Sequence, residues 1–457
     1  MIEELSKSIP FLKELLQNES IIIAGTAVTV LVLWGLMKIN KVLKDHLDVN
    51  VFRNMVNFFF NRDSSKKYEK LREDFYKGST TPEFVDWQKE VLKEIYSEYP
   101  LLNLFGKEYP TLTQEARESF SYPIHKAFKG FSKLNNIKIP EFIIDQKQAE
   151  YIKMMGSTVK RPNMIGFSLD EFELDAEGKI AGFSAKVCQY KHNIATSHIL
   201  DYELYKVYQK KKIQLEQAED KLSLLLNRNK IHKGKTQTDV IMTGCNRHSL
   251  LSVQMMVIFF DEKIQDYKVL LVKRSEDVAI KPNYWQLIPA GGFEIFETDK
   301  TTASLIIRRN FNVEHALYRE LLEEAFNGED YECKKSSDGI QLIENHPDII
   351  QLTDWLNKGE AHLHFLGNVL DLVSLRSELS FLLVVDNPSF SEKIFKHNHE
   401  SQDLQTIQVN ELPEMLEDEL LYPSSAGLLH LAMKSELFKE RNLLQTTPKV
   451  EREEVGV

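Results

Sequence analysis

The chain has 457 residues, of which 42% are hydrophobic and 27% charged, which is typical of two or three folded domains. Its formal net charge of −11 argues against a general electrostatic attraction to nucleic acid, so we expect no polymeric nucleic acid as a partner. The cysteines are far apart and form no CxxC pair, which indicates reduced thiols rather than a disulfide framework or a zinc site: Cys188, Cys245 and Cys333.

One long uncharged run lies near the N-terminus, where residues 20–37 read SIIIAGTAVTVLVLWGLM. As a helix this run is roughly 27 Å long, close to the roughly 30 Å of a bilayer core. A cleaved signal peptide is a second interpretation, but the charges before the run are mixed and no small-residue cleavage site follows it. A buried core helix is the third, although such a helix is usually shorter or has a polar face. We therefore predict a transmembrane helix at residues 20–39.

The charges that flank this run predict its orientation. Lys38, Lys41, Lys44 and Arg53 follow it, so the positive-inside rule predicts a single-pass membrane protein with everything after the run on the cytoplasmic side. The C-terminal part would then be cytoplasmic, with the lipid bilayer as a partner. Residues 1–19 have an apolar stripe at helical spacing, which would form an interfacial helix or a helix–helix contact that builds a homo-oligomer on activation.

The remaining chain changes its periodicity twice. Polar helical patterns give way after Asn163 to two alternating runs that predict a β-hairpin, and then to a helical run from about His198 to Asn229. The helical run is a solvated helix with one packed face or a short coiled coil. The predicted boundaries are 1–19 (amphipathic segment), 20–39 (membrane helix), 40–150 (mostly helical), 151–240 (hairpin and long helix), 241–437 (dense α/β) and 438–457 (disordered tail).

The dense α/β part shows short apolar runs separated by helical patterns. Its expected strands are 252–261, 268–273, 285–289, 363–370 and 379–385, and its expected helices are 313–324, 389–396 and 424–437.

Three glutamates share one face of the predicted helix at 313–324. Glu320, Glu323 and Glu324 are spaced i, i+3 and i+4, so their carboxylates crowd together and repel each other unless a cation lies between them. Mg²⁺ prefers such oxygen ligands and often bridges to substrate phosphates. Arg319 is placed to pair with a neighbouring carboxylate and to orient it. The alternative is an ordinary solvent-exposed acidic helix.

The surroundings of this helix favour the metal site. A strand ends in Lys273 and Arg274, a Trp-containing strand follows, and Pro289–Gly292 forms a Gly-Gly turn before the acidic helix. This ordered set resembles the Nudix superfamily, whose box has Gly, five residues, Glu, seven residues and then Arg-Glu-x-x-Glu-Glu. Here Gly291 is followed after five residues by Glu297, and Arg319–Glu324 completes the box.

The resemblance covers residues 250–437, and the chain departs from the family pattern in two ways. Between Glu297 and Arg319 lie 21 residues, the segment 298–318, where the family has seven. Phe326 stands at the box glycine position, with Gly328 two residues later. The predicted fold class is thus α+β, with a transmembrane helix, a helical linker with a β-hairpin, and a C-terminal Nudix-type α/β/α sandwich.

The resemblance also implies site residues. It implies Arg319 and Glu323 as catalytic residues and Mg²⁺ as the cofactor, with four metal-binding carboxylates: Glu297, Glu320, Glu323 and Glu324. An anionic nucleotide would in addition meet nearby cations and an aromatic ring: Lys273, Arg274, Trp285, Arg308 and Arg309. Trp285 is alternatively a core side chain, and the two later arginines are alternatively surface charges.

The domain order resembles the transmembrane–Nudix effectors of CBASS, a bacterial anti-phage system. In that system a nucleotidyltransferase (CD-NTase) makes a cyclic nucleotide second messenger. The resemblance implies an effector in the bacterial inner (cell) membrane that binds this messenger and triggers membrane disruption and cell death. A membrane-tethered, Mg²⁺-dependent hydrolase of nucleoside diphosphate derivatives is the second interpretation. A protein-binding scaffold with an inactive Nudix fold is the third.

Overall fold

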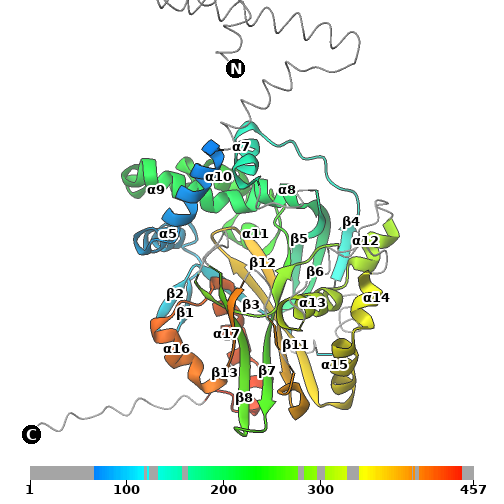
Figure 1. Cartoon of the computed structure of the whole chain (residues 1–457). Coiled ribbons are helices and arrows are strands. Elements are labelled where there is room, and N and C mark those ends of the chain that lie inside the picture. Colours follow the sequence, from blue (N-terminus) through cyan, green and yellow to red (C-terminus); the bar gives the residue numbers. More distant parts are fainter. Residues whose placement is uncertain are drawn as a thin grey trace, which may run out of the picture. The chain divides into compact units, whose positions relative to one another are not determined.

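The computed structural model describes residues 66–117, 121–122, 132–156, 163–275, 283–295, 304–326, 339–393, 395–396 and 401–444. The chain divides into two compact units, residues 1–71 and 72–457. In the first unit, only residues 66–71 are described, and they are helical. The second unit contains every described sheet (Figure 1).

A mixed sheet forms the centre of the second unit. In its described part, six strands lie in the order β13 (Ser401–Gln408), β8 (Asp266–Arg274), β7 (Ser252–Asp261), β12 (Arg376–Val385), β11 (Ala361–Asp371) and β3 (Thr111–Glu115). Two short strands join it: β9 (Trp285–Leu287) pairs with β8, and β10 (Ala290–Gly292) pairs with β7. The neighbours β7 and β12 are parallel, and the other pairs are antiparallel.

Both faces of this sheet are buried, which explains the nearly continuous apolar sequence of β7. Val253 and Met255 face one core together with α13 (Val313–Leu321) and α15 (Pro347–Lys358). Met256 faces the opposite core together with helices of the C-terminal segment. These helices are α16 (Leu412–Asp418), α17 (Pro423–Lys434) and α18 (Glu436–Glu440). The arrangement is an α/β/α sandwich.

A second sheet packs against the α13 side of the sandwich. It contains β4 (Ser132–Asn136), β6 (Ile180–Gln189) and β5 (Ile165–Leu174), and β5 and β6 confirm the predicted hairpin. Phe167 and Phe183 extend from this hairpin into the core that α13 shares. The hairpin therefore belongs to the same folded body as the box helix.

A group of helices adjoins the sandwich. It comprises α5 (Pro82–Ile95), α7 (Gln146–Met155), the π-helical turn η2 (Ile194–His198), α9 (Ile199–Gln217), α10 (Leu226–His232) and α11 (Gln237–Met242). The long helix expected up to Asn229 is wrong, because α9 ends at Gln217. Asp220 then accepts a hydrogen bond from the backbone N–H of Leu222 and starts a separate 3₁₀ turn.

Among the described residues, four strands lie within 40–150, where mostly helical structure is expected, and β4 of the second sheet is one of them. A short hairpin is formed by β1 (Leu102–Leu104) and β2 (Lys107–Tyr109), and β3 then adds to the edge of the main sheet beside β11. Later in the chain, the helix expected at 389–396 is only a 3₁₀ turn at Pro388–Phe390.

The predicted membrane helix at 20–39 and the amphipathic segment 1–19 lie outside the described residues. Within the part that the structure describes, no helix is both long and apolar enough to cross a bilayer. This finding overturns the fold class and the membrane location expected from the sequence. We correct the fold class to a mixed α/β body, in whose described residues no helix qualifies as a transmembrane span.

Candidate functional site

The glycine pair of the box forms β10, which hydrogen-bonds to β7 with Ala290 opposite Gln254 and Gly291 opposite Val253. This register turns Gly291 toward α13. A side-chain carbon at Gly291 would lie only 2.0 Å from Cδ of Glu320, so the Glu320 carboxylate packs directly on the glycine backbone. The absence of a side chain is therefore required by the close approach of this carboxylate.

Arg319 fixes that carboxylate in place. Its Nη2 donates to the carbonyl oxygen of Gly292 at 2.8 Å and also to Oε1 of Glu320. Both residues are buried, with Arg319 2% and Glu320 6% exposed. The predicted pairing of Arg319 with a neighbouring carboxylate is confirmed, and it joins the box helix to the box strand.

The last part of the acidic helix is not α-helical. After Leu321 the chain forms a π-helical turn, η4 (Leu322–Phe326), which contains Glu323 and Glu324. The backbone N–H of Ala290 donates to Oε2 of Glu324 at 2.8 Å. Two box carboxylates thus reach adjacent residues of β10, whereas Glu323 lies half-exposed on the turn. Single π-helical turns inside helices occur frequently at functional sites.

Part of the long insertion forms helix α12 (Ser304–Asn310). The backbone continues into α13 after Asn312, whose side chain accepts from the backbone N–H of Glu314 and caps the helix. Ile307 is buried in the core, while Arg308 and Arg309 lie exposed on α12. Glu297, the remaining predicted metal ligand, lies outside the described residues.

The three other predicted ligand-binding residues lie together at β8 and β9. Trp285 is only 5% exposed and belongs to the core on the α17 side. It therefore matches the alternative given above, that of a core side chain. Lys273 lies with its Nζ 5.4 Å from the centre of the Trp285 ring and pairs with Glu419. Arg274 lies over the ring of Tyr422 at 5.0 Å.

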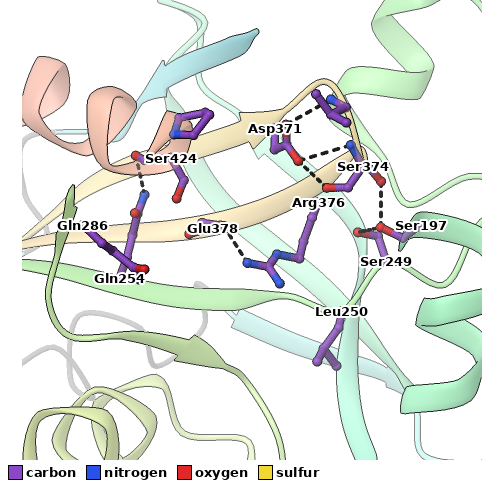
Figure 2. Close-up of polar contacts among 12 residues, drawn as sticks. Ser197, Ser249, Leu250, Gln254, Gln286, Asp371, Ser374, Arg376, Glu378 and Ser424 are labelled. Carbon is purple, nitrogen blue, oxygen red and sulfur yellow. Dashed lines mark hydrogen bonds and ion pairs between the residues drawn. The ribbon is translucent and has the colours of Figure 1, made fainter. Parts of the chain in front are cut away.

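A polar strip crosses β7 and β12 on the α17 side of the sheet, formed by Ser252, Gln254, Glu378 and Ser380. The strand register sets Glu378 beside Ser252 and Ser380 beside Gln254. Nε2 of Gln254 donates to Oγ of Ser380 at 2.9 Å. It also donates to the carbonyl oxygen of Ser424 at 3.3 Å (Figure 2). Because Gln254 lies opposite Ala290 in β10, the polar strip adjoins the box strand.

Arg376 supplies a cation at the end of the polar strip. Its Nη2 donates to Oε1 of Glu378 at 2.9 Å (Figure 2). Burial by itself would lower the pKa of Arg376, but the nearby Glu378 carboxylate and Tyr422 raise it above its ordinary value. Burial raises the pKa of Tyr422, against the opposing effect of Arg376 and Arg274. At neutral pH the Arg376 guanidinium is therefore charged and lies near a neutral Tyr422 phenol.

These strip residues were not predicted from the sequence. Gln254 lies within the otherwise apolar strand β7, whereas Glu378 lies in the polar first part of β12. Polar side chains that are almost fully buried need hydrogen-bonding partners. That interruption of an apolar run was the available signal. Among the described residues, Oε1 of Gln254 has no hydrogen-bond partner.

The helical group and the segment after it donate hydrogen bonds to the turn between β11 and β12, residues 372–375. Two buried arginines donate to its carbonyls: Arg228 to Leu372 O at 2.9 Å and Val373 O at 2.6 Å, and Arg247 to Leu375 O at 3.2 Å. Oγ of Ser197 donates to the carbonyl oxygen of Ser374 at 2.6 Å (Figure 2). These hydrogen bonds, which we call the turn clamp, fix the end of β12 on which Arg376 lies.

The donor set of the box fits Mg²⁺ in part. Among the described residues, no three acidic, histidine or cysteine side chains converge as a metal cluster. However, Glu320 and Glu324 meet adjacent residues of β10, and Mg²⁺ commonly takes one or two carboxylates together with waters and substrate phosphates. Glu320, Glu323 and Glu324 are the described residues that would hold the ion, which would polarise a phosphoryl oxygen.

No protein-family model matches the sequence, and no curated protein matches it. Among solved structures, a MutT/nudix family protein from Enterococcus faecalis matches with 17% identity and a TM-score of 0.20, over 35% of this chain and 43% of that one. The chain therefore spans less than half of that protein.

Two further solved structures cover more of their own length. The NUDIX domain of Shewanella oneidensis NrtR, complexed with ADP ribose, has 16% identity and a TM-score of 0.24, over 40% of this chain and 86% of that one. The Ap4A hydrolase of C. elegans has 14% identity and a TM-score of 0.22, over 39% and 92%. TM-scores this low do not establish a common fold, so the functional interpretation depends on the side chains of the site.

Proposed function

We propose that this chain is a nucleotide receptor whose Nudix-like α/β/α sandwich binds a phosphate-containing nucleotide at the box strand β10. The observation that supports it most is the buried clamp of Arg319 and Glu320 against Gly291 and Gly292. A buried carboxylate fixed on a glycine backbone, with Glu324 beside it, offers oxygen ligands for a divalent cation. That cation would in turn attract phosphate oxygens.

The polar strip supports the box strand from the opposite face of the sheet. Its side chains lie on the α17 side and are almost fully buried, whereas Glu320 packs on Gly291 from the α13 side. The strip therefore contributes to the position of β10, and the nucleotide contacts that we propose are those of the box carboxylates and their cation.

We infer more narrowly that the ligand is a cyclic nucleotide of the kind that a CD-NTase makes in CBASS, and that its binding is sensed rather than followed by hydrolysis. Glu320 and Glu324 are held by Arg319 and by a backbone N–H, respectively.

The test is calorimetric titration of the full chain with cyclic dinucleotides and trinucleotides, with and without Mg²⁺. We expect Mg²⁺-dependent binding that Glu324→Gln weakens at least about tenfold, which corresponds to about 1.4 kcal/mol. The control Glu262→Gln changes an exposed carboxylate on the β7–β8 turn and should leave affinity unchanged. Absence of binding across the panel, with the fold intact, would contradict the receptor proposal.

A hydrolase is the second candidate, and the same clamp favours it because an oriented box carboxylate is what metal-assisted attack on a pyrophosphate requires. Chromatographic analysis of nucleoside diphosphate derivatives incubated with the chain and Mg²⁺ separates the two functions. A hydrolase releases a nucleoside monophosphate, and Glu323→Gln abolishes the release without changing the circular dichroism spectrum. A receptor returns its ligand unchanged.

A further inference from the structure

A cavity of about 360 Å³ lies outside the box and the polar strip. We name it the junction cavity, because its walls come from α5, from the β1–β2 hairpin and from the segment that leads into α17. Its principal lining residues are Val85, Lys89, Lys107, Tyr109, Tyr284 and Leu420. Figure 1 shows α5 and the β1–β2 hairpin on the same side of the sandwich as α16.

The walls of the junction cavity are tied together by specific contacts. Nζ of Lys107 donates to the carbonyl oxygen of Glu419 at 3.0 Å. The backbone N–H of Leu421 donates to the Tyr109 hydroxyl, which fixes this ring at the cavity wall. The backbone N–H of Trp285 donates to Leu420 O at 2.8 Å. The cavity is therefore enclosed by elements that the fold already holds in position.

The charge in the junction cavity is positive. Lys89 and Lys107 are two of its lining residues, while Glu108, the carboxylate among its described lining residues, is paired with Lys93 at 2.5 Å outside the lining. Lys89 pairs with Asp86, whose side chain is 72% exposed. An exposed pair of this kind contributes little, so the ammonium is easily transferred to a better anion. Lys107 has no carboxylate partner among the described residues.

Two aromatic rings complete the lining. Tyr109 is only 6% exposed, and burial raises its pKa to about 12, so its phenol adds no negative charge. Tyr284 is the second ring, and it comes directly before β9 in the sequence. Aromatic faces bind planar rings by stacking, and lysines bind phosphate as point charges.

We propose that the junction cavity binds a phosphomonoester with a planar aromatic group, of the size of a purine mononucleotide. Its phosphate meets Lys89 and Lys107, and its ring lies against Tyr109 and Tyr284. The volume is near the lower end of the roughly 300–1,000 Å³ found for small-molecule sites, which suits one nucleotide rather than a longer one. This site is separate from the box and uses no divalent cation.

A ligand there would also contact the segment that flanks the predicted nucleotide-binding residues. Glu419 bonds Lys107 through its carbonyl and Lys273 through its carboxylate. Leu420 lines the cavity and accepts from the backbone of Trp285. Occupation of the junction cavity therefore stabilises the position of β9 beside the box.

The test is calorimetric titration of the full chain with AMP, adenosine and inorganic phosphate in EDTA, which keeps any metal-dependent site silent. We expect AMP to bind at least about tenfold more tightly than adenosine or phosphate. Lys89→Gln and Lys107→Gln should each weaken AMP at least about tenfold, or about 1.4 kcal/mol. Lys358→Gln, an exposed lysine on α15, is the matched control and should change nothing.

Val85→Trp provides a second test, since a large ring at this half-exposed position fills the cavity without removing a charge. It should abolish AMP binding while the urea midpoint and the circular dichroism spectrum stay as in the parent. Three outcomes overturn the proposal: no AMP binding at about 1 mM, AMP affinity unchanged by both lysine substitutions, or AMP affinity lost in Glu324→Gln, which would place the ligand at the box.

Discussion

Arg319→Leu breaks a buried ion pair and should be strongly destabilising. The side chains of Arg319 and Glu320 are 3% and 8% exposed, so removal of the guanidinium leaves a carboxylate in the core without this partner. Loss of one partner of such a pair costs about 3–5 kcal/mol of the free energy of unfolding. The exposed pair Lys358–Asp354, at 57% and 51%, is the control, and Lys358→Leu should cost less than about 1 kcal/mol.

The double variant Arg319→Leu/Glu320→Leu separates the ion pair from the other contact of the arginine. It removes the stranded carboxylate but still loses the hydrogen bond to Gly292 O, so the expected cost falls to about 1–3 kcal/mol. Urea unfolding in EDTA, followed by tryptophan fluorescence, measures all three. With a slope of about 4 kcal/mol/M for a body of this size, the single variant shifts the midpoint by roughly 1 M. A shift of the urea midpoint no larger than that of Lys358→Leu would refute the stabilising role of the buried Arg319–Glu320 pair.

Further substitutions test the remaining features. Gly291→Ala forces a side chain into the Glu320 carboxylate and should weaken Mg²⁺-dependent nucleotide binding at least about tenfold in calorimetry, with circular dichroism unchanged. Arg228→Leu removes the donor to the carbonyl oxygens of Leu372 and Val373 and should lower the free energy of unfolding in urea by about 3–5 kcal/mol. A loss below about 1 kcal/mol would contradict the stabilising role of the turn clamp. Burial lowers the pKa of His198 to about 3 in the folded protein. Below about pH 6.5 the unfolded chain therefore binds a proton at this residue that the folded chain does not bind. As the pH falls, the free energy of unfolding should decrease by about 1.4 kcal/mol per pH unit. His198→Gln should reduce this loss between pH 6.5 and pH 5 in urea titrations, and an unchanged slope refutes it. Burial raises the pKa of Cys188 to about 12, so iodoacetamide should leave this thiol of the native protein unlabelled at pH 8 in peptide mass spectra.

The sequence predicted the parts of the fold that depend on local periodicity. The apolar run of β7 was placed at its observed bounds, and the alternating runs of β5 and β6 gave the hairpin, because side-chain burial repeats along each strand. The strand β3 was missed. Its residues Thr111–Glu115 are mostly polar, and its partner β11 begins at Ala361, so the pairing that makes it a strand is non-local.

For the site, the sequence predicted that Arg319 pairs with a neighbouring carboxylate, and the structure shows that the pair with Glu320 forms where both side chains meet the glycine pair of β10. Spacing also predicted one face for Glu320, Glu323 and Glu324, but the π-helical turn changes how the last two project. Arg376 could not be found in this way. It becomes part of the site only through the parallel pairing of β12 with β7, which no local pattern specifies.

The origin of β3 has a consequence for how this gene could be divided or recombined. A chain that began at residue 241 would leave the backbone groups of β11 bare from Gly367 to Asp371, and would lose the donors that Arg228 and Ser197 provide to the adjoining turn. Open strand edges of this kind invite pairing with other chains and aggregation. The shortest segment that could be transferred to another protein as a folded unit is thus much longer than the box. It includes the strand Thr111–Glu115 and the residues that donate to the β11–β12 turn, which lie well before the box in the sequence.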